Sequence, residues 1–273
     1  MQTIKKTIVY SFYVCDGWKG KETNRIHFEC LKNYSRVFDN AVICLVIDNI
    51  KDVETISDVE KFFIDIFKSE SITFKVVQNG TFRESAVFYN EIASNLGKID
   101  GLVFFAHNKG ITNVEDGYDK ESIYKWITSM YFLSLQYEEE AVRKLTDERY
   151  FSYGSLLDYV NTDSNESTPF LDMGKNNFMY TGTFFWINAG TLSDYMSKSG
   201  LTIPKLTDRW YAENFMANMV PFKCCTAHNG KYAVDYIGGR KFIKYLIERT
   251  LTDDFRNDFY NFNDYILKNA NIA

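Results

Sequence analysis

The segment 101-GLVFFAHNKGITN-113 begins as an apolar run and stops abruptly at His107-Asn108-Lys109-Gly110. The run has the length and the residue types of a strand that is buried on both faces. In open α/β sheets, ligands bind just beyond the carboxyl ends of such strands. The sequence therefore predicts a buried strand at 102–106 and makes the tetrapeptide that follows it a candidate ligand contact.

Working outward from this run, further apolar runs alternate with segments of helical spacing. Strand-like runs occupy 7–14, 41–48 and 72–78, and the segments between the first three strands have polar content and helical periodicity. A helix is expected over 83–97, because this segment opens with charge and closes at a glycine. Strands that alternate with helices of this length predict a mostly parallel, doubly wound sheet.

The second half of the chain continues in helices, short strands and one long loop. We expect a single strand-like run over 178–192 and an amphipathic helix over 255–270. A long helix is expected over 121–146, followed by a loop or excursion over 152–177. Two further helices are expected at about 191–199 and about 208–219, and a short strand near 222–226. Since neither a Pro-rich linker nor an internal repeat occurs, the sequence predicts one Rossmann-like α/β domain over 1–250, with a C-terminal amphipathic helix at 251–273 packed on it.

Composition bounds the class of protein. The 273 residues are 45% hydrophobic and 25% charged, as in an ordinary globular domain, and the net charge of −5 argues against a nucleic-acid partner. No apolar run is long enough to cross a membrane, and the first residues enter a strand pattern without a signal-peptide cleavage site. The five cysteines contain no C-x-x-C. We therefore expect a cytoplasmic protein without a transmembrane segment, for which peripheral contact with a membrane stays open.

Three places carry residue types suited to chemistry, and the first is the opening tetrapeptide. His107 and Lys109 are donors that can grip a diphosphate, and Gly110 lets a turn bring backbone N–H groups close to an anion. The alternative is a polar turn with a surface lysine and a hydrogen-bonded histidine.

The second place is a glycine set among large aromatic residues, in YTGTFFW (180–186). A glycine inside a strand weakens it unless another backbone or a ligand must come close. Gly182, flanked by Thr181 and Thr183 and followed by Trp186, therefore suggests a pocket wall. A bulge or a tight packing contact would explain the same glycine.

The third place is Arg209 and Glu213, which are four residues apart and are expected on one helical face. As a surface ion pair they would contribute only a few tenths of a kcal/mol. As a carboxylate that faces a cleft, Glu213 could act as a general base.

Taken in this order, the three places resemble a group of bacterial glycosyltransferases associated with surface polysaccharide loci. In that group the pattern is roughly a strand with His-Thr-Lys-Gly, a Ser-Gly-Asn-Phe-Trp-Trp-like strand and an Arg-x-x-x-Glu helix. The resemblance spans roughly residues 80–220 and includes the helix start at Arg83-Glu84. Asn108 replaces the usual small hydroxyl residue, and Thr183 stands where the group tends to have Asn.

The resemblance implies the nucleotide-diphospho-sugar transferase fold and a reaction. A sugar would move from a nucleotide-sugar donor to a hydroxyl of a carbohydrate or lipid-linked acceptor, with Glu213 as the catalytic base. Asp48, which closes the second strand, and the end of the first strand at 10–16 would hold the nucleotide. The other residues that the resemblance implies for donor binding are Arg83, His107, Lys109, Gly110 and Arg209. Those that it implies for the acceptor pocket are Thr181, Gly182, Thr183 and Trp186.

One departure concerns the metal. Transferases of that fold commonly hold a divalent cation on an Asp-x-Asp motif, which this chain lacks. We therefore expect His107 and Lys109 to neutralise the leaving diphosphate, with help from Arg83 or Arg209. A Mn²⁺ or Mg²⁺ ion bound by scattered carboxylates and His228 stays an alternative without a spacing signal.

Two other functions stay open. The chain could be a catalytically inactive nucleotide- or carbohydrate-binding relative, or an unrelated doubly wound enzyme or interaction protein. The absence of G-x-G-x-x-G, of a P-loop and of G-x-S-x-G argues against a dehydrogenase, an NTPase and a hydrolase.

Overall fold

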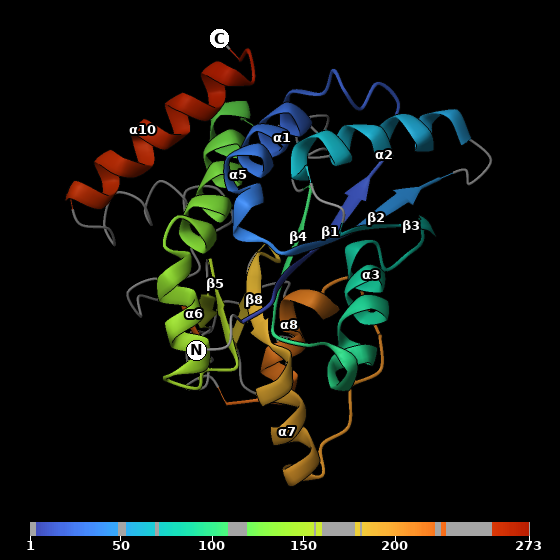
Figure 1. Ribbon diagram of the computed structural model, residues 1–273, viewed down its shortest axis with the longest axis vertical. Coiled ribbons are helices and arrows are strands. Elements are labelled where there is room, and N and C mark those ends of the chain that lie inside the picture. Colours follow the sequence, from blue (N-terminus) through green and yellow to red (C-terminus); the bar gives the residue numbers. More distant parts are fainter. Residues whose placement is uncertain are drawn as a thin grey trace, which may run out of the picture.

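A seven-stranded sheet runs through the computed structural model (Figure 1). The structure describes residues 4–48, 53–68, 71–108, 119–155, 157–159, 178–180, 182–221, 225–227 and 253–272. Within them the strand order across this sheet is β3-β2-β1-β4-β8-β5-β9. Its strands are β1 (Lys6–Tyr13), β2 (Asn40–Ile47), β3 (Ile72–Gln78), β4 (Leu102–His107), β5 (Ser152–Gly154), β8 (Phe185–Asn188) and β9 (Cys225–Ala227). A separate pair is formed by β6 (Leu157–Tyr159) and β7 (Phe178–Tyr180).

The strand order reverses at β1. The chain first adds β2 and β3 on one side of β1 and then returns to place β4 on its other side, and all three pairings are parallel. Beyond β4 the sheet is mixed, because β8 is antiparallel to both β4 and β5, while β9 is parallel to β5. The position between β1 and β4 is therefore a topological switch point, where the loops after the two strands diverge.

Alternate residues of the central strands enter two separate cores. In β1, Ile8, Tyr10 and Phe12 belong to one core, whereas Val9 belongs to the other. The first core is closed by α1 (Glu22–Tyr34), α2 (Val53–Phe67), α5 (Lys120–Leu135) and α10 (Asp253–Asn269), as Figure 1 shows. The second is closed by α3 (Glu84–Glu91), η2 (Ala93–Lys98), α7 (Ala189–Ser199) and α8 (Tyr211–Met219). Helices thus cover both faces, and the central strands β1, β2 and β4 are mostly apolar and buried.

The prediction of a mixed α/β fold with a mostly parallel sheet is confirmed. The strands expected at 7–14, 41–48, 72–78 and 102–106 are all present. The domain boundary at 250 lies outside the described residues and stays a prediction.

The single strand expected over 178–192 is wrong. The run is divided between β7 and β8, which belong to different sheets. A turn separates them, closed by a hydrogen bond of 3.0 Å from Thr183 N to Tyr180 O, with Gly182 at φ +90°. The apolar pattern continues through this turn because both strands and the turn are buried, so periodicity alone does not reveal the break.

The long helix expected over 121–146 is also divided, into α5 and α6 (Glu138–Thr146), with Tyr137 out of helical conformation. The carbonyl of Ser134 accepts a hydrogen bond of 2.9 Å from the Trp186 indole N–H. The last turn of α5 thus has one of its carbonyl groups hydrogen-bonded outside the helix, by the indole of β8.

The loop expected over 152–177 contains two short strands, β5 and β6. Gly154 of β5 passes so close to β8 that a Cβ atom would lie 2.5 Å from the Cβ of Phe185. This glycine is therefore required by strand pairing. Most of the rest of 152–177 lies outside the described residues.

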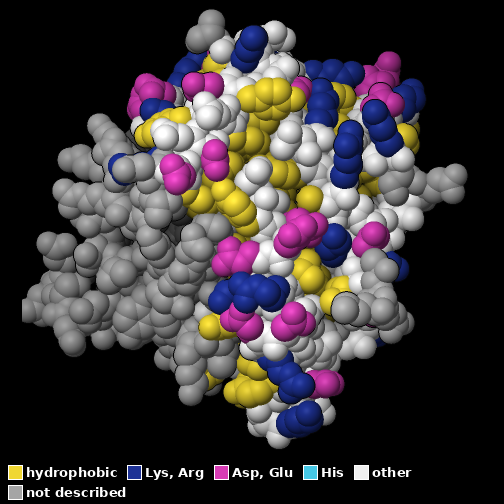
Figure 2. Space-filling view, turned by 60° about the vertical axis from the view of Figure 1, so that its left-hand side comes forward, with side chains coloured by type: hydrophobic (Ala, Val, Ile, Leu, Met, Phe, Trp, Pro, Cys, Tyr) yellow, Lys and Arg dark blue, Asp and Glu magenta, His cyan; other side chains and the backbone are white. Residues whose placement is uncertain are grey.

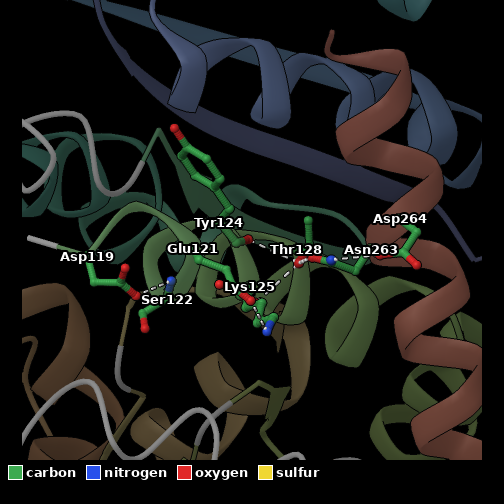
Figure 3. A network of polar contacts seen from close by, with 8 residues as sticks. All are labelled: Asp119, Glu121, Ser122, Tyr124, Lys125, Thr128, Asn263 and Asp264. Atoms are coloured by element: carbon green, nitrogen blue, oxygen red, sulfur yellow. Dashed lines mark hydrogen bonds and ion pairs between the residues drawn. The ribbon is translucent and has the colours of Figure 1, made fainter. Parts of the chain in front are cut away.

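The C-terminal helix α10 packs on α5 and α1 through an aromatic face. Phe255, Phe259 and Phe262 are buried in the first core. A buried polar contact crosses this apolar interface: the Thr128 hydroxyl donates a hydrogen bond of 2.8 Å to Asn263 Oδ1 (Figure 3). Both side chains are buried, so the contact fixes how α10 lies on α5.

The described surface is mixed in charge. On the face that Figure 2 shows, Lys and Arg side chains are interspersed with Asp and Glu around a band of apolar side chains. None of the helices in the described ranges has the length and the apolar character that crossing a bilayer would need.

The buried contact between α5 and α10 predicts a non-additive effect on stability. We expect Thr128→Val to lower the free energy of unfolding by about 1–3 kcal/mol, because the substitution leaves Asn263 Oδ1 buried without its donor. The double variant Thr128→Val/Asn263→Leu should be more stable than the sum of the two single variants. Urea unfolding of the wild type, the two single variants and the double variant measures their free energies of unfolding. Strict additivity would contradict a direct interaction.

Candidate functional site

The carboxyl ends of β1, β2, β3 and β4 meet at one edge of the sheet, because these four strands are parallel. This edge includes the switch point between β1 and β4, where ligands of open α/β sheets bind. The polar side chains that lie along it come from the ends of four separate strands. They belong to two separate groups, each held together by hydrogen bonds.

The first group surrounds Asp48, the residue after β2. The Tyr13 hydroxyl donates a hydrogen bond of 2.6 Å to Asp48 Oδ2, and Asn79 Nδ2 donates one of 2.8 Å to Oδ1. These bonds, the one from Tyr13 first, hold the pKa of the Asp48 carboxyl below its ordinary value. Asp48 is exposed, so the edge presents an ionised carboxylate to solvent with a tyrosine beside it.

The second group is buried and connects β4, the β7–β8 turn and α8. His107 Nε2 lies 3.1 Å from the carbonyl oxygen of Gly182 and 3.3 Å from Thr183 Oγ1. The Gly182 N–H donates a hydrogen bond of 3.1 Å to Glu213 Oε1. Because a carbonyl oxygen only accepts, the contact with Gly182 requires a proton on Nε2 of His107. The structure thus brings together a residue from each of the three places that the sequence singles out.

Gly182 is the centre of this second group, and two constraints demand a glycine there. Its φ of +90° is disfavoured for other residues. A Cβ atom at this position would also lie 2.5 Å from Met130 Sδ. Of the two interpretations of this glycine, the structure shows the tight packing contact. The half-buried indole of Trp126, 3.5 Å from the same Cβ position, completes the wall around it.

The pairing expected for Arg209 and Glu213 on one helical face is wrong. Helix α8 begins at Tyr211, so Arg209 precedes it. Arg209 is exposed and its guanidinium lies 4.1 Å from the centre of the Trp210 ring, whereas Glu213 is only 4% exposed. The two side chains therefore belong to different environments, one at the surface and one in the buried group.

A buried serine connects the starts of α3 and α8. The Ser85 hydroxyl donates a hydrogen bond of 2.7 Å to the carbonyl of Arg209 and accepts one of 3.1 Å from the N–H of Ala212. Ser85 is two residues after Arg83, which is exposed at the start of α3. The hydrogen bond from Ser85 therefore brings the backbone of Arg209 close to that of Arg83. Two arginines that are distant in sequence thus share one region of the sheet edge.

Trp186 does not line a surface. It is fully buried in the first core, and its indole N–H is bonded to the Ser134 carbonyl. The expectation that Trp186 forms an acceptor pocket therefore needs correction, and Trp126 is the tryptophan that lies beside Gly182. Lys109, Gly110, Thr181 and His228 lie outside the described residues.

The described side chains do not fit a divalent cation. No group of three or more His, Cys, Asp or Glu side chains in the described ranges is placed to hold one. Asp48, the carboxylate at the edge, has both oxygens hydrogen-bonded to Tyr13 and Asn79.

Several residues of the site carry no clear signal in the sequence. Asn79 follows a strand and precedes a glycine, which marks a turn but not a contact with Asp48. Ser85 and Trp126 sit in helices and have no local feature that marks them.

Comparisons with known proteins give little. No family model matches the chain, and no curated protein matches it. Among solved structures, the crystal structure of S. aureus TarS 1–349 is similar, with 11% identity over 97% of this chain and 72% of that chain and a TM-score of 0.32. A TM-score this low supports no inference about function, so the site is interpreted from its own residues.

The turn at Gly182 predicts a graded effect of alanine substitution. Gly200 provides a matched control, since its φ is +65° but a Cβ atom there would have no neighbour within 4 Å. We expect Gly200→Ala to cost about 1–2 kcal/mol through its backbone alone. Gly182→Ala should cost about 1–3 kcal/mol more, because Met130 must also move. Chemical unfolding of both variants measures the difference, and equal costs would contradict the packing constraint.

Proposed function

We propose that the chain is a glycosyltransferase that moves a sugar from a nucleoside diphosphate donor to a hydroxyl of a carbohydrate or lipid-linked acceptor. The observation that carries the proposal is the convergence, at the switch-point edge, of the Tyr13–Asp48 pair with the buried group of His107, Gly182 and Glu213. The order of His107, Gly182 and Glu213 along the chain is also the order of the pattern by which the sequence resembles glycosyltransferases of polysaccharide loci.

In this proposal, the nucleoside lies on the side of β1 and β2. The exposed, ionised Asp48 accepts hydrogen bonds from a ribose hydroxyl or a base N–H, as carboxylates at the end of a second strand do in this class of sheet. Tyr13 orients that carboxylate through its hydroxyl.

The diphosphate lies toward β4. His107 ends β4, and Lys109 and Gly110 follow it in sequence, so their side chain and backbone N–H groups are assigned to the phosphates. Arg83 and Arg209, whose backbones Ser85 keeps together, add guanidinium groups on the same edge. Positive side chains would then stabilise the leaving nucleoside diphosphate in place of a metal ion.

The acceptor lies on the side of the β7–β8 turn, beside Thr181, Gly182 and Thr183. Glu213 takes the proton from the acceptor hydroxyl as that oxygen attacks the anomeric carbon of the donor sugar and the nucleoside diphosphate leaves. The Gly182 N–H donates to Glu213 Oε1 and so fixes the carboxylate beside the turn. In the proposal this positioned carboxylate is the group that takes up the proton.

One observation favours a second candidate, a binding protein without transfer activity. Glu213 is 4% exposed and is hydrogen-bonded to the backbone, which also suits a purely structural carboxylate. Donor binding without hydrolysis or transfer would identify this alternative.

Nucleotide binding tests the donor side. We expect at least one of UDP, GDP, CDP and ADP to raise the melting temperature, since a ligand that binds only the native state stabilises it. Asp48→Asn should weaken that binding by about 1.5–3 kcal/mol, the contribution of a hydrogen bond to a charged group. Asp58→Asn removes the same charge from a surface ion pair with Lys19 and should leave the affinity unchanged. If no nucleotide binds the wild-type chain, the proposal fails.

Substitution of the proposed base tests the transfer step. Glu213→Gln keeps an Oε1 acceptor for the Gly182 N–H but cannot take a proton. We expect donor affinity and melting temperature close to the wild type and a transfer rate lower by about 10²–10⁴, as for loss of a positioned general base. Transfer kinetics with an identified donor and acceptor measure this. Near-normal transfer would remove Glu213 from the mechanism, whereas a loss of donor binding would reassign it to the donor side.

A further inference from the structure

Asn108, the residue directly after β4, has its side chain turned into the protein. Only 6% of the residue is exposed. Its Oδ1 accepts a hydrogen bond of 2.8 Å from the Tyr13 N–H, and its Nδ2 donates one of 3.0 Å to the Tyr13 carbonyl. The Asn108 amide therefore pairs with both main-chain groups of one residue of the neighbouring strand.

This pairing continues the sheet beyond the end of β4. The last register pair of the two strands is Ser11 with His107, and the Asn108 N–H still reaches the Ser11 carbonyl at 3.3 Å. Further along, the Asn108 side chain takes the place of a backbone partner for Tyr13. An amide can do so because it carries an acceptor and donors side by side, as a peptide group does. A carboxylate of the same shape has no donor.

The same amide also reaches the start of α1. Asn108 Nδ2 lies 3.2 Å from Asn24 Oδ1, and Asn24 Nδ2 donates a hydrogen bond of 3.0 Å to the Trp18 carbonyl. Asn24 is fully buried. The connection from β1 to α1 is thus tied to the end of β4 through two side-chain amides.

Tyr13 is consequently held from both sides. It pairs with Val46 of β2, and Asn108 holds its opposite edge. Its side chain is then directed so that the hydroxyl lies 2.6 Å from Asp48 Oδ2.

We propose that Asn108 is a positioning residue, which fixes the Tyr13 backbone at the switch point and through it the Tyr13–Asp48 pair that receives the nucleotide. The inference rests on the proposed function, because it assigns Asn108 to the nucleotide side of that same site. Asn108 itself makes no contact with substrate. Its amide groups are hydrogen-bonded to other groups of the protein. In the proposal Asn108 is therefore a structural residue between His107 and Lys109, which are assigned to the donor diphosphate.

The test is Asn108→Asp, which keeps the shape of the side chain and removes its two N–H donors. Asn263→Asp is the matched control, since Asn263 is 3% exposed and lies in the α5–α10 interface, away from the edge. Hydrogen exchange of the segment 9–24 reports the tie to β1 without any ligand. Affinity for the nucleoside diphosphate that binds the wild type reports its consequence for the site.

We expect faster exchange of 9–24 and about tenfold or greater loss of nucleotide affinity in Asn108→Asp, as for loss of a buried hydrogen bond at a binding site. At acidic pH, both the exchange rate of 9–24 and the nucleotide affinity of Asn108→Asp should return partly toward those of the wild type at the same pH. A buried carboxyl beside a carbonyl oxygen has a raised pKa, so the new Asp regains a donor when it is protonated, below that pKa. The Asn263→Asp control should lose stability but keep its nucleotide affinity.

Two results would overturn the proposal. Unchanged exchange of 9–24 in Asn108→Asp would show that the side chain does not hold Tyr13. Faster exchange with unchanged nucleotide affinity would show that the tie does not position the site. Failure of the proposed function is seen separately, because the wild-type chain itself would then bind none of UDP, GDP, CDP and ADP, and the role of Asn108 in nucleotide binding would fall with it.

Discussion

The backbone of β1 is hydrogen-bonded on both sides, to β2 and to β4, in two parallel ladders. A parallel strand in this position requires helical crossovers and therefore helices on both faces, which is why the chain needs two cores. It also brings the carboxyl ends of four strands to one edge. The elements that form the candidate site depend on this pairing, because Tyr13, Asp48 and His107 stand at those strand ends. An error in the β1–β4 register would move each of them relative to the others.

The second requirement is the turn at Gly182, which connects the sheet edge to α8. A glycine adopts φ +90° readily, whereas a buried carboxylate is unfavourable unless it is hydrogen-bonded. The Gly182 N–H satisfies an oxygen of Glu213, while the Gly182 carbonyl meets Nε2 of His107. Buried polar groups of this kind stabilise one arrangement strongly when all partners are present and destabilise it when one is removed. The turn therefore holds His107 and Glu213 in a defined relation although they are 106 positions apart in the sequence.

Local patterns are sufficient for the strands of the parallel half and for the expectation that their polar ends meet at one end of the sheet. The apolar runs at 7–14 and 102–106 are strands because their residue types favour that conformation locally, and the alternation of strands and helices predicts where their polar ends meet. The breaks at Gly182 and Tyr137 could not be predicted in this way. Next to each break lies a contact between distant segments, the Met130 sulfur at Gly182 and the Trp186 indole at Ser134, which no local window contains. For the same reason Trp186 resembled a pocket residue in sequence although it is a core residue.

The tetrapeptide after β4 illustrates how neighbouring polar residues divide their roles. His107 is directed to the β7–β8 turn, and Asn108 is directed to β1 on the other side of the strand end. The first two side chains of the tetrapeptide thus contact different neighbours of β4. Within the described ranges, no group of three or more His, Cys, Asp or Glu side chains is placed to hold a cation. In the proposed function, the two arginines whose backbones Ser85 holds near each other are positive side chains suited to a donor diphosphate.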